Sequence, residues 1–226
     1  MYKYRLFIAA LVKYYYMVRN KVGGKMEKKT HVALGNLVAL AIVNPGSINS
    51  LLITIGAASL GGILSDVDLK DSTTDKLFDR LITSLITVIV VGIFINYLFD
   101  INLYSKIKEF NNAFNYIICI SLFTIMAYMG SKTHHRSFTH SFLGLFIYTF
   151  ILSYAFNKAV IVPFFLAYLS HILIDLFNKK GLTLFYPVKS RFCLNLCDAN
   201  GMINKLLFSL FSISNIILLI MLGIKS

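Results

Sequence analysis

Long apolar segments recur along the chain and constrain its fold more than any other feature. A helix of about 20 apolar residues crosses the roughly 30 Å hydrocarbon core of a bilayer. Only helices and closed barrels satisfy all their backbone hydrogen bonds there. The segments are His31–Val43, Ser50–Leu64, Leu81–Phe99, Ala113–Gly130, Phe138–Phe156, Ala159–Phe177 and Leu206–Ile224. We therefore expect an all-α fold, a polytopic integral membrane bundle with about six or seven membrane segments, of which the first two are short enough to form a tilted pair or a helical hairpin.

The charged residues support a membrane protein and indicate its orientation. A net charge of +12 would suggest nucleic-acid binding in a soluble protein, but only 14% of the residues are charged. No basic and aromatic patch typical of a nucleic-acid surface occurs, so no nucleic-acid partner is expected. With the N-terminus inside, the pieces 1–30, 65–80, 131–137 and 178–205 carry 18 of the 22 lysines and arginines. Since these residues collect in cytoplasmic loops, we expect a multi-pass protein of the inner or plasma membrane with this face towards the cytoplasm.

Residues 1–25 form a basic N-terminal extension that matches neither a membrane span nor a signal peptide. Its apolar stretch, Leu6 to Val12, is too short to cross a bilayer, and no small-residue cleavage site follows it. A basic helix on an anionic membrane surface is one interpretation. We favour another, in which translation starts at Met26 and residues 26–226 form a single membrane-embedded domain.

Histidines and aspartates gather at the cytoplasmic ends of the apolar segments. All five histidines and the three best-placed acids lie there: His31, Asp66, Asp68, His134, His135, His140, His171 and Asp175. Each has an ordinary interpretation by itself, as an interfacial residue, a helix terminus, a structural pair or a headgroup-binding loop. Burying so many ionisable groups near hydrocarbon costs several kcal/mol unless they are paired or bind a cation. Their shared location favours a metal site.

The spacing of these residues is also typical of metal ligands. His171 and Asp175 are four residues apart, so they share one face of a helix. An Asp-x-Asp turn at a helix end directs two carboxylates to one place. Imidazoles with carboxylates suit zinc, manganese or iron, and we expect zinc first. The expected ligands are His31, Asp66, Asp68, His135, His140, His171 and Asp175. They are too many for one tetrahedral zinc, so we expect two divalent ions.

These residues also carry a resemblance to a known family. The chain resembles the YdjM-like family of membrane-bound, metal-dependent hydrolases, described also as inner-membrane-associated hydrolases regulated by LexA. The matching motifs, spread over residues 30–188, are His31 with Gly35, Asp66-Val67-Asp68, the run His135-Arg136-Ser137-Phe138-Thr139-His140-Ser141, and His171 with Asp175, Gly181 and Pro187. Ser65 and Leu69 depart from the family, which often has proline and histidine there. His134 is a candidate substitute for that missing histidine.

The resemblance implies hydrolysis assisted by bound metal. The family is more distantly similar to zinc-dependent phospholipase C and P1-type nucleases, which hold clustered metals on a helical fold. We therefore expect cleavage of a phosphoester in a lipid or lipid-linked substrate at the cytoplasmic membrane face, with membrane lipids as partners. Asp68, Arg136 and Thr139 are the expected catalytic residues, and the guanidinium of Arg136 could clamp a phosphate with its bidentate fork.

Two other classes of function remain open from the sequence. A metal transporter would place ionisable residues near the membrane midplane, whereas these lie at one edge. A non-catalytic lipid-binding membrane protein would use the same loop for headgroups without chemistry.

The first prediction concerns the start of the protein. Lys21-Val22-Gly23-Gly24-Lys25 can be encoded by a purine-rich, ribosome-binding-like stretch directly before Met26. We expect N-terminal mass spectrometry of the native protein to find a chain that begins at Met26. A chain that begins at Met1 or Tyr2 would contradict this prediction.

Overall fold

The described part of the chain is a bundle of helices. The structure is a computed structural model that describes residues 28–68, 113–194 and 201–225. Its α-helices are α2 (Lys28–Val43), α3 (Ile48–Leu64), α6 (Ala113–Ser131), α7 (Phe142–Ser153), α8 (Lys158–Leu176) and α9 (Gly201–Lys225), joined by the short 3-10 helices η1 (Ser65–Asp68) and η2 (Phe138–His140). Within these residues one isolated bridge, Leu182 to Phe192, is present and there is no sheet. The all-α expectation is confirmed for this part of the chain.

Within the described residues, four helical stretches are long and apolar enough to cross a membrane. They are Ile48–Asp68, Phe114–Ser131, Lys158–Leu176 and Met202–Leu222. Helix α2 has 16 residues and therefore a length of about 24 Å, which agrees with the short first segment expected from the sequence. The expected segment 81–99 and the extension 1–25 lie outside the described residues.

The fifth apolar segment is shorter than the sequence indicated. A helix was expected over residues 138–156, but α7 has only 12 residues, about 18 Å, which is too short to span the hydrocarbon core. It begins late because the Ser141 side chain accepts the backbone N–H of Gly144 at 3.1 Å and caps the helix. As a result His140 lies in the η2 turn that precedes the helix.

Helices α2, α3 and α8 pack with close backbone approach. A Cβ atom at Gly35 of α2 would lie 2.9 Å from the Cβ of Ala167 in α8, and one at Gly61 of α3 would collide with the carbonyl of Phe164 in α8. Small residues permit this approach, which is common where helices associate in lipid. Because the backbones approach so closely at Gly35 and Gly61, no larger side chain separates α8 from α2 and α3 at these points.

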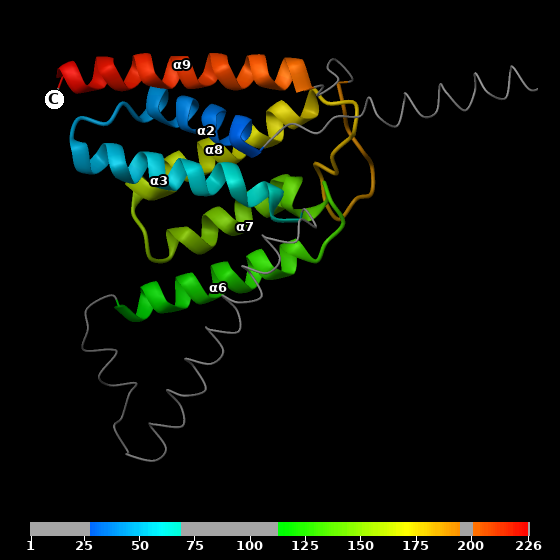
Figure 1. The fold of residues 1–226 in the computed structure, drawn as a ribbon. Coiled ribbons are helices and arrows are strands. Elements are labelled where there is room, and N and C mark those ends of the chain that lie inside the picture. The colour runs from blue at the N-terminus through cyan, green and yellow to red at the C-terminus, as the bar shows by residue number, and fades with distance from the viewer. Residues whose placement is uncertain (1–27, 69–112, 195–200, 226) are drawn as a thin grey trace, which may run out of the picture.

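Helix α9 lies on the outside of the bundle against α2 (Figure 1). Only 6% of its apolar stretch Met202–Leu222 is buried. Most of its large side chains are therefore available to lipid. Two polar contacts fix it to α2: the Thr30 hydroxyl donates to Asn204 Oδ1 at 2.8 Å, and Asn215 Nδ2 donates to the Ala33 carbonyl at 2.8 Å.

One end of the bundle gathers several helix ends. The start of α2, the end of α3, the end of α6, the start of α7 and the end of α8 all lie on the right in Figure 1. This is the end that the sequence assigned to the cytoplasm. The segment after α8 also lies at this end, and its Leu182 and Phe192 exchange backbone hydrogen bonds at 2.9 and 2.8 Å.

The orientation can be tested with cysteine labelling. Cys193 is exposed at the end with the converging helix termini, and Cys119 is buried. In a Cys197→Ser background, a membrane-impermeant maleimide should label Cys193 only after the cells are permeabilised, because we expect that end to face the cytoplasm.

Lys158 is exposed at the opposite end, at the start of α8. A Lys158→Cys variant that also carries Cys193→Ser should be labelled in intact cells. Labelling of Cys193 in intact cells would reverse the orientation.

Candidate metal centre

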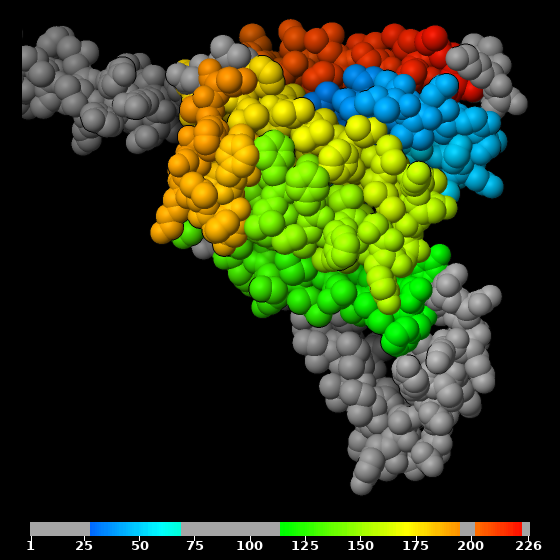
Figure 2. Space-filling model, turned by 180° about the vertical axis from the view of Figure 1, so that it is seen from behind, coloured from blue at the N-terminus to red at the C-terminus, as the bar shows by residue number. Residues whose placement is uncertain are grey.

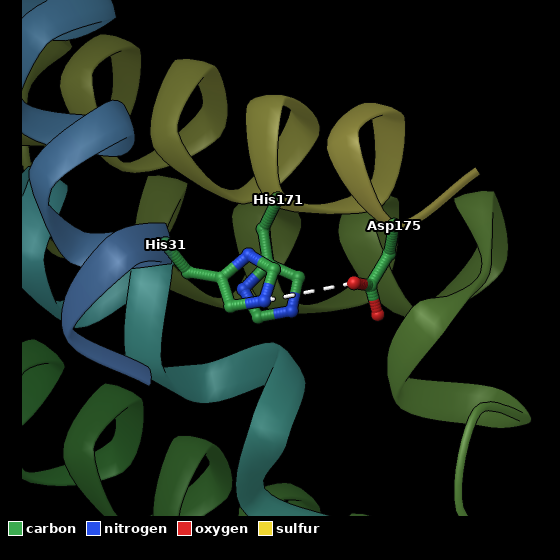
Figure 3. A group of neighbouring side chains, drawn as sticks. All are labelled: His31, His171 and Asp175. Atoms are coloured by element: carbon green, nitrogen blue, oxygen red, sulfur yellow. Dashed lines mark ion pairs between the residues drawn. The ribbon is translucent and has the colours of Figure 1, made fainter. Parts of the chain in front are cut away.

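Helix ends and turns bring histidines and aspartates together inside the bundle. His31 comes from the first turn of α2, Asp66 and Asp68 from η1, His140 from η2, and His171 and Asp175 from successive turns of α8. None of these six residues is more than 2% exposed. Figure 3 shows His31 reaching from α2 towards His171 and Asp175 on α8. Asp66, Asp68 and Asp175 are also the only carboxylate side chains among the residues that the structure describes.

The expected ligands form three overlapping groups. Within each group the candidate ligand atoms lie within 4.8 Å of one another. The groups are His31 with His171 and Asp175, Asp66 with His140 and His171, and Asp68 with His135 and His140. The structure therefore brings together all seven ligands expected from the sequence. His134 is exposed and belongs to none of these groups.

A backbone contact defines which ring nitrogen of His171 could bind a metal ion. Its Nδ1 lies 2.8 Å from the carbonyl oxygen of Gly62 in α3. A carbonyl can only accept, so Nδ1 carries the proton and Nε2 presents a lone pair. The ring is stacked on His31 with centroids 3.7 Å apart and an interplanar angle of 10°. A hydrogen bond of this kind commonly orients a histidine that binds a metal.

His140 is oriented in the same way by Asp68 and Thr139. The Thr139 hydroxyl donates to Asp68 Oδ2 at 2.8 Å, so its oxygen is left to accept from His140 Nδ1 at 3.2 Å. His140 Nδ1 also lies 3.5 Å from Asp68 Oδ2. Both contacts assign the proton to Nδ1 and leave the lone pair on Nε2. Asp68 is fully engaged, because it also accepts from the backbone N–H of Arg136 at 2.8 Å and contacts His135 Nδ1 at 2.9 Å.

Several pairs of the remaining candidate ligand atoms are spaced as two ligands of one ion would be. His140 Nε2 lies 3.5 Å from Asp175 Oδ2 and 3.9 Å from Asp66 Oδ1, and His31 Nε2 lies 3.6 Å from Asp175 Oδ1. Two atoms bound at about 2.1 Å to the same ion lie roughly 3 to 4 Å apart. His140 Nε2, His171 Nε2 and Asp175 Oδ1 are buried and have no hydrogen-bond partner. Buried acceptors without partners are costly, and a cation among them would remove that cost.

The charge of the cluster also fits a divalent cation. Three buried carboxylates and one buried guanidinium, that of Arg136, leave a formal charge of −2 when the histidines are neutral. Burial alone lowers the pKa of His140, but the hydrogen bond and charge of Asp68, with the charges of Asp175 and Asp66, raise it above its ordinary value. The surroundings of His140 therefore favour positive charge, from a proton or from a metal ion.

Arg136 is part of the cluster and has an unusual backbone conformation. Its φ is 64°, in the left-handed region that residues other than glycine seldom adopt. Its N–H donates to Asp68, and its carbonyl accepts from the N–H and the hydroxyl of Thr183, both at 3.1 Å. The guanidinium lies 3.3 Å from Asp175 Oδ2 and also donates to the carbonyl of Lys180. Its contacts are thus with the protein, and the expected role as a phosphate clamp stays a prediction, as do catalytic roles for Asp68 and Thr139.

Sequence reasoning missed the backbone groups that hold this cluster. The carbonyls of Gly62 and Lys180 orient His171 and Arg136, and Tyr168 donates its hydroxyl to the Thr139 carbonyl at 2.7 Å. Main-chain acceptors leave no residue-type signal. The Gly61-Gly62 pair was the one available hint, since paired glycines indicate close approach of another element.

The fold and this cluster define a helical membrane protein with a buried histidine and aspartate centre that could hold a metal ion. The chain belongs to the YdjM inner membrane protein family, whose model matches residues 26–224. The resemblance inferred from the motifs is thereby confirmed, and so is an inner membrane protein as the class. No curated protein and no solved structure matches the chain. The likeness to the fold of phospholipase C and P1-type nucleases stays a prediction.

Metal content tests the centre directly. We expect purified wild-type protein to contain zinc, manganese or iron by plasma mass spectrometry, and His171→Ala to lose it, with affinity at least about tenfold weaker. His134→Ala is the matched control, because this exposed histidine belongs to no ligand group. Equal metal content in all three proteins would show that the metal is bound elsewhere.

Proposed function

We propose that the protein is a metal-dependent hydrolase that cleaves a phosphoester in a lipid or lipid-linked substrate at the cytoplasmic membrane face. The observation that carries this proposal is the convergence of every described carboxylate with three buried histidines and the partly exposed His135. A purely structural cluster would satisfy its own polar atoms, whereas here the Nε2 atoms of His140 and His171 have no hydrogen-bond partner.

We infer one principal ion position, shared by the two buried groups that have His171 in common. His31, His140 and His171 would supply nitrogen, and Asp66 and Asp175 would supply oxygen. When bound, a divalent ion would polarise a phosphoryl oxygen and lower the pKa of water to about 7. The sequence suggested two ions. The hydrogen bonds that saturate Asp68 favour a different role for it, in which it orients His140 without itself binding the ion.

His135 is suited to transfer protons in the proposed reaction. Its Nδ1 lies 2.9 Å from Asp68 Oδ1, so Nδ1–H donates to the carboxylate and Nε2 is left to accept a proton. Its side chain is 35% exposed, whereas His31, His140 and His171 are buried. An imidazole oriented by a carboxylate and open to water is a common general base or acid.

The location of the centre favours an amphiphilic substrate over transport of the metal. The ligands lie where helices α2, α3 and α8 begin or end, as expected at the level of lipid headgroups. A transport path needs ionisable groups near the midplane and on towards the other side. In the described residues every carboxylate lies at this one end. The assays described below distinguish hydrolase activity from a non-catalytic lipid-binding role.

The number of ions can be read from two aspartate variants. Asp68→Asn should keep about one metal equivalent but bind it about 10 to 100 times more weakly, because it disturbs the orientation of a ligand. Asp175→Asn should lose the ion, since it removes a carboxylate from the centre. Metal titration followed by stoichiometry measures both. Two equivalents in the wild type that fall to one in Asp68→Asn would replace the single position with two.

Hydrolysis can be tested independently of metal binding. Metal-loaded protein should release phosphate or a phosphorylated headgroup from a panel of phospholipids and polyprenyl phosphates. His135→Gln should keep its metal while kcat falls by about 100-fold or more, because a proton-transfer group is lost. Lys158→Ala, at the opposite end of α8, is the control. Full metal occupancy without turnover of any substrate in the panel would favour the non-catalytic alternative.

A further inference from the structure

A cavity lies beside the metal centre. None of the residues that line it belongs to the ligand groups. Its volume of about 650 Å³ is in the range of small-ligand sites. Part of its wall is the loop before η2, through His134 and Ser137, and part is the segment after α8, through Thr183. The residues between His134 and Ser137 are His135 and Arg136, which contact Asp68 and Asp175. The cavity and the metal centre therefore share the same loop.

Among the residues that the structure describes, the charged side chains that line the cavity are all cations. They are Lys132, Lys189 and Arg191. Lys189 and Arg191 are exposed, and no ion pair joins either of them to a carboxylate of the described residues. The hydroxyls of Thr133, Ser137 and Thr183 donate to backbone carbonyls. Recognition by this cavity would therefore depend on positive charge, which suits a phosphate group.

The segment that supplies these cations also exposes large apolar side chains. Phe185, Val188 and Leu194 are 54%, 57% and 55% exposed, close in sequence to Lys189 and Arg191. In Figure 2 the segment, coloured orange, lies against the ends of the yellow and green helices at one end of the molecule. Apolar side chains beside cations are typical of a surface that lies at the membrane interface. A ligand here would meet positive charge and hydrocarbon together.

We propose that this cavity binds the phosphate group of an anionic amphiphile and holds it beside the metal centre. Lys189 and Arg191 would contact the phosphate, while Phe185 and Val188 would lie against the acyl or prenyl chain. The proposal rests on the proposed function only in treating the bound phosphate compound as the substrate. Binding itself requires no metal, so it can be measured separately.

The test is a binding titration on metal-stripped protein in a neutral detergent. The probes are dihexanoyl phosphatidic acid, dihexanoylglycerol and inorganic phosphate, each followed by calorimetry. Lys189→Gln with Arg191→Gln removes two exposed cations from the cavity. Lys179→Gln with Lys180→Gln removes the same charge from the same segment, and neither of these residues lines the cavity.

We expect phosphatidic acid to bind the wild type and the Lys179/Lys180 variant with Kd values within about twofold, and the Lys189/Arg191 variant about tenfold more weakly. Dihexanoylglycerol and inorganic phosphate should each bind the wild type at least about tenfold more weakly than phosphatidic acid, because each lacks half of the proposed contact.

Four results would overturn the proposal. Equal weakening in both double variants would assign binding to general surface charge. Equal affinity for dihexanoylglycerol would exclude a role for the phosphate, and equal affinity for inorganic phosphate would make the ligand free phosphate instead of an amphiphile. No binding of phosphatidic acid to the wild type would exclude the site. The proposed hydrolase activity would still be tested independently by the metal content and turnover assays.

Discussion

Close backbone approach between α2, α3 and α8 is the constraint on which the rest of the structure depends. Gly35 lies against Ala167, and Gly61 lies against the backbone at Phe164, so no side chain separates the helices at these two points. At this spacing His171 reaches the Gly62 carbonyl and stacks on His31. Lipid supplies no hydrophobic drive for helix association, so packing of small residues and buried polar contacts must supply it. The same contacts that hold the bundle therefore also build the centre.

The unpartnered nitrogens of the polar cluster are oriented by hydrogen bonds from the groups around them. Asp68 receives hydrogen bonds from Thr139 and from the backbone of Arg136, and through these it fixes the ring of His140. The left-handed backbone of Arg136 would be unfavourable alone, but hydrogen bonds at both its N–H and its carbonyl stabilise it. One short loop thus orients a ligand and balances the charge of Asp175. It also forms one wall of the cationic cavity.

The sequence predicted the helical segments and the membership of the cluster because both depend on residue type and spacing. Apolar length is visible directly, and an i, i+4 pair such as His171 and Asp175 follows from helix geometry. The details that the sequence did not reveal depend on tertiary contacts. The late start of α7 follows from the cap at Ser141, and the burial of the Arg136 guanidinium follows from an aspartate 39 positions away. The different contacts of Asp66 and Asp68 also depend on partners that spacing cannot reveal.

The distribution of the ligands along the chain has a consequence for biosynthesis. His31 is made early and Asp175 late, and they meet only when α8 lies against α2. While the chain is being inserted, the α2–α3 pair carries an imidazole and two carboxylates whose partners have not yet been translated. Ionisable groups without partners are unfavourable in lipid, so this pair is not stable there by itself. An ion held by His31 and Asp175 together, as we propose, would therefore be acquired only after α8 has been inserted, as a late step of assembly.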